Sequence, residues 1–258
     1  MRWVLNHVAT GLIGVIVVGG LVLVALVALH FVRQRGLISD DESASLGGTL
    51  EVVGAIYGIV LAFVIVLMWQ GLDAARDAVS DEASALAQFS VDVRALPPAD
   101  RARIEKGLTD YLHAVVNDDW RHMKEGNESL RAHEALDGLL ATMEGVVPET
   151  EVQKTWYDEA ISKLNEAASH RRKRLEAMSN ELPNPLRVLL FGGGFITLAF
   201  VVIHGARRSP THTFVVAALS ALVAYNLYLV VILDYPFSGS VRVSPQPFRQ
   251  GVLAPFAG

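Results

Sequence analysis

Two groups of polar residues in this sequence resemble parts of catalytic sites. His133 and Glu134 begin as the zinc-binding helix His-Glu-x-x-His does, but the fifth position of that pattern holds Asp137 instead of His. Asp118 and Asp119 could supply the carboxylates of a general acid and a general base, but no nucleophile or metal ligand accompanies them. A solvated helix end is therefore the simpler interpretation of this acidic pair.

Two further motifs lack the context that their chemistry needs. Gly192, Gly193 and Gly194 lie inside an apolar run, without the strand and the Lys of a phosphate-binding loop, and we interpret them as helix-packing residues. Ser238 lacks the flanking glycines of a nucleophile elbow. The chain has no cysteine, which excludes thiol nucleophiles and cysteine metal sites. The sequence thus predicts neither an enzyme nor a cofactor or metal site.

The elements that must position any other function are membrane spans. The 258 residues are 52% hydrophobic and 19% charged, and their mean hydropathy of +0.35 is high for a soluble domain. Four apolar runs, at about residues 8–32, 50–70, 186–206 and 212–233, each reach the roughly 20 residues that cross a bilayer. The first run is too long for a signal peptide and is predicted to remain as a span.

These runs divide the chain into four parts. We predict an all-α, four-span helical membrane protein with spans 1 and 2 in residues 1–70, a helical cytosolic insert at 71–185, spans 3 and 4 in 186–234, and a cytosolic tail at 235–258. The insert should hold one helix before Pro97, a second after Pro98, a short third between residues 126 and 148, and a long fourth from about Thr150 to Pro183.

Basic residues near the span ends predict the orientation of the chain. An even number of spans places both termini and the insert on one face. The membrane-proximal basic residues there include Arg76, Arg171, Arg172, Lys173 and Arg174. The opposite face carries Arg33, Arg35, Arg207 and Arg208. By the positive-inside rule the richer face is cytoplasmic, and residues 170–174 are an anchor of this kind more simply than a site for anions or lipid headgroups.

The insert is acidic. Residues 71–185 carry 22 acidic side chains and 14 Lys and Arg, which leaves a formal charge of −8, against +3 for the remainder of the chain. Phosphate backbones bind to basic surfaces, so nucleic acid is not expected as a partner.

The second span has two distinct faces. One carries small residues at helical spacing: Gly47, Gly54, Gly58 and Ala62. Such a face lets another helix approach closely in lipid. The other carries the apolar residues Val52, Ile56, Ile59, Val60 and Phe63. This second face either contacts lipid and other helices or forms the apolar constriction of a pore. Glu51, at the outer end, should face water, a partner or an interface, because a carboxylate inside lipid is costly.

Several motifs along the chain carry a resemblance to a known family. They are the run Val53-Gly54-Ala55-Ile56-Tyr57-Gly58, then Trp69, Ala75-Arg76, Glu82-Ala83-Ser84-Ala85-Leu86, Trp120, the segment Leu233-Asp234-Tyr235-Pro236-Phe237-Ser238-Gly239, and Pro247-Phe248. With these residues the chain resembles bacterial membrane proteins described as bestrophin-like, over nearly its whole length. It is more distantly similar to the bestrophin anion channels, whose Gly-rich second span ends at tryptophan and whose fourth span is followed by Pro-Phe-Gly.

The resemblance implies a homopentamer in the bacterial inner membrane. In bestrophins five copies of the second span line a pore with an apolar neck. If Trp69 matches the tryptophan that ends their pore helix, the neck falls on Val52, Ile56 and Val60. A slip of one position would instead bring Glu51, Ala55 and Ile59 to the axis and make the outer mouth acidic.

Two departures bear on the ion that such a pore would conduct. The acidic run that follows Pro-Phe-Gly in calcium-responsive bestrophins is replaced here by Ser240-Val241-Arg242-Val243-Ser244, so no calcium clasp is predicted. The acidic insert also disfavours chloride, unless Arg76 or residues 171–174 line the path.

The function that we expect is conduction of small ions by an oligomer, with the lipid bilayer as the other partner. The alternative is a non-conducting membrane scaffold or sensor whose cytosolic helices bind a partner.

Overall fold

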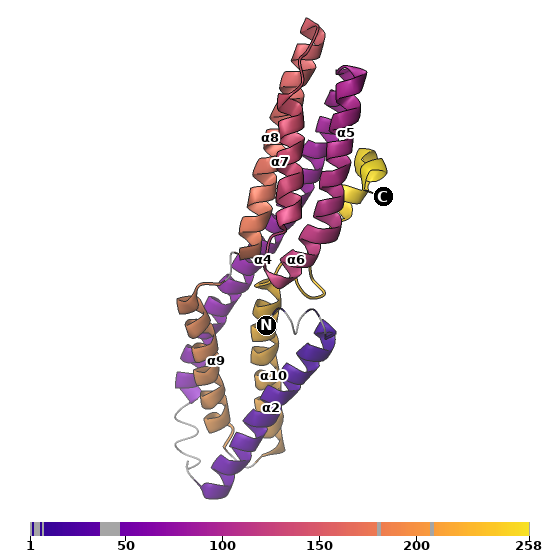
Figure 1. The fold of residues 1–258 in the computed structure, drawn as a ribbon. Helices are drawn as coiled ribbons and strands as arrows, with labels where there is room; N and C mark the ends of the chain where they lie inside the picture. Colours follow the sequence, from indigo (N-terminus) through magenta and orange to yellow (C-terminus); the bar gives the residue numbers. More distant parts are fainter. Residues whose placement is uncertain are drawn as a thin grey trace. The chain divides into compact units, whose positions relative to one another are not determined.

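The structure is a computed structural model that describes residues 1–258 except 1, 3–5, 7, 37–46, 180–181, 207–208 and 258. Within these residues the chain is helical and contains no strand (Figure 1). The long helices are α2 (Thr10–Arg35), α4 (Gly47–Asp92), α5 (Pro98–His113), α7 (Leu130–Glu144), α8 (Glu151–Ser179), α9 (Asn184–His204) and α10 (Pro210–Leu233). The shorter ones are η1 (Val93–Ala95), η2 (Ala114–Asp119), α6 (Trp120–Glu125), η3 (Gln246–Arg249) and η4 (Gly251–Phe256).

Four of the long helices, α2, α4, α9 and α10, are long and apolar enough to cross a membrane. The predicted fold class, all-α with four spans and shorter helices between spans 2 and 3, is therefore confirmed. The third span begins slightly earlier than expected, because Pro185 lies in the first turn of α9, where a missing N–H costs no helical hydrogen bond. Arg207 and Arg208, which we assigned to the opposite face, lie outside the described residues.

The chain forms two compact units. We call residues 7–70 and 181–234 the membrane unit, and residues 1–6, 71–180 and 235–258 the insert unit. Helix α4 contributes its first part to the membrane unit and its second part to the insert unit. Figure 1 shows α9 beside the first part of α4, with α10 between this pair and α2, and it shows α5, α7 and α8 beside the second part of α4.

Large apolar side chains build the core of the membrane unit where α4, α9 and α10 meet. Tyr57, Leu61 and Val64 of α4 pack against Leu190 of α9 and Leu227 of α10. A second cluster of buried residues joins α2 to α9 and α10 and contains Ala25, Leu29, Val201, Val202 and Val216. Tyr228 of α10 closes this unit by donating its hydroxyl to the Thr10 carbonyl oxygen of α2.

The insert unit owes its helix boundaries to prolines, a cap and a wide turn. Helix α5 starts at Pro98, as predicted, and Ser129 Oγ caps α7 by accepting the Ala132 N–H at 3.4 Å. The π-helical turn η2 joins α5 to α6 without a break and brings Asp119 and Trp120 to the buried side. Its extra residue per turn is a feature that the apolar periodicity did not reveal.

Candidate pore helix and its supports

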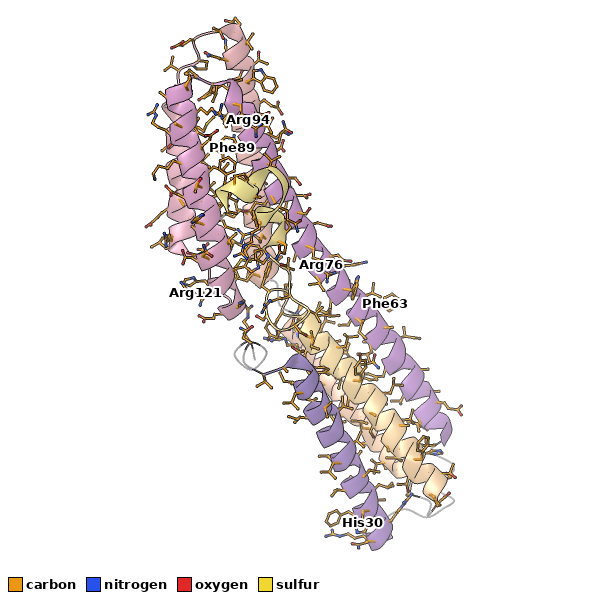
Figure 2. All side chains as sticks on the ribbon, turned by 90° about the vertical axis from the view of Figure 1, so that its right-hand side faces the viewer. His30, Phe63, Arg76, Phe89, Arg94 and Arg121 are labelled. Atoms are coloured by element: carbon orange, nitrogen blue, oxygen red, sulfur yellow. The ribbon has the colours of Figure 1, made fainter. Side chains whose placement is uncertain are left out.

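The apolar face of α4 is exposed. Four residues at helical spacing form what we call the outer stripe: Val52 at 59% exposure, Ile56 at 61%, Ile59 at 60% and Phe63 at 68%. Figure 2 shows Phe63 on the side of α4 that points away from α10. Val60, the third residue of the expected neck, is only partly exposed, while Glu51 is exposed beside Val52. Val52 and Ile56 of the expected neck therefore lie on the exposed row, but Val60 does not. Ile59 and Phe63 continue the row in its place.

The opposite face of α4 is fixed by Tyr57. Its ring is buried, and its hydroxyl donates to the Leu190 carbonyl oxygen at 3.0 Å. A Cβ on Gly193 would lie 2.7 Å from the Tyr57 ring, and one on Gly194 would lie 2.9 Å from its hydroxyl. These two glycines are therefore packing residues, as their place in an apolar run indicated. Gly192 is not, because an added Cβ there would meet nothing within 4 Å. The Tyr57 contact holds α4 with its outer stripe directed away from the rest of the unit.

The small-residue face of α4 does not pack closely on another described helix. Added Cβ atoms at Gly54 and Gly58 would meet nothing within 4 Å. With Ala62, these two residues form the small-residue stripe, which lines an apolar groove of 640 Å³ between α4, α9 and α10. Gly47 is the exception, because a Cβ there would lie 3.3 Å from His204 Cε1. The predicted close helix contact at this stripe thus stays a prediction for a partner outside the chain.

The interior of the insert unit contains an ion cluster that sequence reasoning missed. Arg174 of α8 and Glu82 of α4 are fully buried and paired in bidentate fashion, with Nε to Oε2 at 2.7 Å and Nη2 to Oε1 at 3.2 Å. Arg174 Nη2 also donates to Asp119 Oδ2 at 3.0 Å, and the Tyr111 hydroxyl donates to Glu82 Oε1 at 2.6 Å. We call Glu82, Tyr111, Asp119 and Arg174 the Arg174 cluster.

The protonation of this cluster is set by burial and by its opposite charges. Burial by itself lowers the pKa of Arg174, but the carboxylates of Glu82 and Asp119 more than offset this effect and raise it above its ordinary value. Burial and the negative charge of Glu82 raise the pKa of Tyr111 well above 10. Arg174 therefore stays charged and Tyr111 stays neutral across the physiological pH range.

The cluster corrects two interpretations made from the sequence. Asp119 is not at a solvated helix end: it is fully buried, and its Oδ1 accepts the Ser129 N–H at 3.0 Å. Arg171 and Arg174 are buried too, whereas Arg172 and Lys173 between them are exposed. The reason is helical periodicity, since positions three apart share the face of α8 that packs inward. Of the five membrane-proximal basic residues, only Arg172, Lys173 and the half-exposed Arg76 are exposed enough to act as the predicted positive-inside anchor.

The tail packs on the same cluster through aromatic rings. The Arg174 guanidinium lies 5.0 Å from the Trp120 ring centre and 6.0 Å from that of Phe248. Trp120 meets the Phe237 and Phe248 rings edge to face at 6.1 and 5.7 Å, and its Nε1 donates to the Val243 carbonyl oxygen at 3.2 Å. The family motif residue Phe237 thus has a structural role in the insert unit.

The remaining motif residues shape the turns around the spans. In the membrane unit Asp234 accepts the Leu182 N–H at 2.6 Å and pairs with Arg187 at 2.9 Å, so it joins the end of α10 to the start of α9. Trp69 is half exposed. In the insert unit the Pro236 carbonyl oxygen accepts the Val243 N–H at 2.8 Å, and Gly239 adopts a positive φ of 75°.

The described residues present an exposed apolar row, a small-residue stripe and a buried ion cluster. No cluster of three or more metal-ligating side chains occurs in the part of the chain that the structure describes. The family model described as Bestrophin-like domain matches residues 15–248, and no curated protein matches the chain.

Proposed function

The chain belongs to the bestrophin-like family, and from that premise we propose that it is an oligomeric ion channel of the bacterial inner membrane, a homopentamer whose pore is lined by α4. The observation that carries the proposal is the outer stripe. It is a continuous apolar row on a helix that is anchored on its other face by Tyr57. Five such rows around an axis would form an apolar neck, which can gate by dewetting.

The small-residue stripe supports assembly of copies side by side. Gly54 and Gly58 have open space where a Cβ would stand, so the backbone of a neighbouring helix can approach there. This stripe is on the α4 face next to the outer stripe, where a ring would place the adjacent subunit. Bilayers supply no hydrophobic drive between helices, so this close packing is the contact that would hold the ring.

Contacts within the insert unit support the proposed orientation. Asn6, which precedes α2, donates from Nδ2 to the Lys124 carbonyl oxygen at 2.9 Å, and its Oδ1 accepts the Gly239 N–H at 3.3 Å. Arg2 Nη2 donates to the Met178 carbonyl oxygen at 3.0 Å. Residues before the first span, in the insert and after the fourth span therefore belong on one face of the membrane, which the positive-inside rule makes cytoplasmic.

The charge distribution favours cations over anions. Glu51 is exposed at the start of the outer stripe, and the insert carries a formal charge of −8. Burial of Arg171 and Arg174 removes two of the basic side chains that could have offset this charge along an anion path.

Ion flux from liposomes that contain the purified protein tests the proposal. We expect Ile56→Lys to change the ratio of potassium to chloride flux by at least about tenfold, because a charge in a narrow neck acts directly on passing ions. Ile16→Lys is the matched control, since Ile16 on α2 has the same residue type and the same 61% exposure. Flux that Ile56→Lys leaves unchanged, or that both variants change alike, would contradict the assignment of α4.

The scaffold or sensor function remains the second candidate because of one surface. Val147, Val152 and Trp156, between α7 and the first turns of α8, are exposed at 76%, 67% and 41%. Exposed apolar groups on a unit outside the membrane favour binding to another protein. This candidate predicts no flux from intact, inserted protein.

A further inference from the structure

The end of the membrane unit where α9 gives way to α10 contains a pair of histidines. His204 is the last residue of α9, and His212 lies in the first turn of α10. Their ring centres are 6.2 Å apart and the rings are inclined by 45°. Both side chains line a small cavity of 120 Å³, together with Gly205 and Thr211.

We propose that His204 and His212 bind a divalent transition-metal ion of the class that accepts imidazole in a square-planar arrangement, Cu²⁺ or Ni²⁺. A metal bound to imidazole nitrogen at about 2.0–2.1 Å lies about 3.2 Å from the ring centre. Two rings that share one ion therefore have centres about 5–6.5 Å apart, depending on the angle at the metal. The observed separation of 6.2 Å corresponds to an angle of roughly 150° at the metal. This angle suits two rings on opposite sides of a square-planar ion and is too wide for a tetrahedral one.

The chemistry of the cavity fits such an ion. His212 Nδ1 is buried, and among the described residues it has no hydrogen-bond partner. A buried nitrogen of this kind is usually paired, and a metal ion would supply the missing partner. The cavity has room for water, which would complete the coordination sphere of a bound ion. The described residues supply no third His, Asp or Glu, so the ion would have two protein ligands.

The surrounding helices would hold the two rings in place. Gly47, the first residue of α4, leaves room for the His204 ring, because a Cβ there would come within 3.3 Å of Cε1. Arg33 of α2 clamps the connection between the histidines, donating to the Gly205 carbonyl oxygen and to Thr213 Oγ1, each at 2.8 Å. The charge of Arg33 weakens cation binding, whereas Glu51, one turn along α4 from Gly47, has the sign that favours it.

Copper binding to the full-length protein in lipid nanodiscs tests this site. Cu²⁺ is the probe because nitrogen ligands bind it most tightly among the divalent ions of its row. The protein is purified without a histidine tag, and affinity and the number of bound nitrogens are read from titration and electron paramagnetic resonance. We expect one Cu²⁺ with two imidazole nitrogens, and His204→Gln or His212→Gln should each weaken its binding at least about tenfold.

A matched control is His30→Gln, because His30 is a single exposed histidine on α2. This variant should bind Cu²⁺ as the parent does. Equal binding by the parent and the two pair variants would overturn the proposal, as would an equal loss in His30→Gln. None of these readouts depends on ion flux, so the metal site and the proposed channel can fail independently.

A second measurement needs no variant and covers the case in which the substitutions impair folding. Diethyl pyrocarbonate modifies accessible imidazoles, and mass spectrometry locates the modified residues. Bound Cu²⁺ should protect His204 and His212 and leave the exposed His133 of α7 reactive. If bound Cu²⁺ does not reduce the modification of His204 and His212, the proposed metal site is contradicted.

Discussion

Arg174 is the single side chain on which the interior of the insert unit depends most. Its removal leaves the buried carboxylate of Glu82 without its cation and leaves Asp119 with only the longer 3.7 Å pair to Arg171. We expect Arg174→Ala to lower the free energy of unfolding of the insert unit by about 3–5 kcal/mol. Arg174→Lys should rescue only part of this loss, because an ammonium cannot pair with Glu82 in bidentate fashion. Denaturant unfolding, followed by the fluorescence of Trp120, measures the free energy of unfolding of both variants.

The matched control for Arg174 is Arg172, two positions away and exposed on α8. Arg172→Ala should change the free energy of unfolding by no more than about 0.5 kcal/mol. Equal effects of the two substitutions would mean that the buried cluster does not carry the stability assigned to it.

Tyr111 gives the cluster a predicted response to alkaline pH. Its pKa in the folded protein is raised well above the value of about 10 that it has when unfolded. Above pH 10 the Tyr111 hydroxyl therefore loses its proton in the unfolded chain and keeps it in the folded chain. The free energy of unfolding that Tyr111 contributes below pH 10 then falls by roughly 1.4 kcal/mol per pH unit as the pH rises. Tyr111→Phe should remove this part of the slope. An unchanged slope between pH 10 and 11 would contradict the prediction.

At the scale of the helix, α4 has one face that packs within the chain and one that is open to a second copy. Gly58→Leu should leave the protomer folded, because an added Cβ there meets no other atom within 4 Å and the groove beside it has room for a side chain, but it should convert the oligomer to protomers. Gly193→Leu should act in the opposite way and unfold the membrane unit, because the Tyr57 ring occupies that space. Mass measurement of the protein–detergent complex distinguishes the two outcomes.

The Gly58 prediction has a clear contrary result. An oligomer that persists in Gly58→Leu with unchanged mass would show that the small-residue stripe faces lipid. The subunit contact would then have to be sought on α2 or α9.

The helices themselves were predictable, because their signals are local. Apolar length marks the spans, and Pro97 and Pro98 mark the end of one helix and the start of the next. The Arg174 cluster was not predictable in the same way. The pair joins Glu82 to Arg174, 92 residues further along the chain, and no local pattern links the two. A run of basic residues beside a span also has the same composition whether its side chains are buried or exposed. The spacing of Arg171 and Arg174 on one face of α8 was the available signal.

For α4, the existence of two faces was predictable from the sequence, but the direction of each face was not. Alternation of small and large residues indicated two faces of α4, and the structure places both. The exact row that points outward depended on the anchoring of Tyr57, which is a tertiary contact. That contact directs Ile59 and Phe63 outward and leaves Val60 partly covered.

For the molecule as a whole, the proposed topology places the three segments of the insert unit on one side of the membrane. The chain has no native cysteine, so single cysteines report position without interference. On intact cells a membrane-impermeant maleimide should label Thr211→Cys and should reach Asn127→Cys and Ala254→Cys only after permeabilisation. Labelling of Ala254 and Thr211 from the same side would contradict the proposed topology.

The central claim is that the outer stripe of α4 faces an aqueous ion path, and accessibility of a thiol at Ile56 tests it most directly. Charged methanethiosulfonate reagents modify thiols in water and do not reach thiols in lipid. The account predicts that such a reagent reduces ion flux through Ile56→Cys and spares the parent and Ile16→Cys, whose position has the same 61% exposure. Flux through Ile56→Cys that the reagent leaves untouched, from protein shown to be inserted and conducting, would contradict the claim.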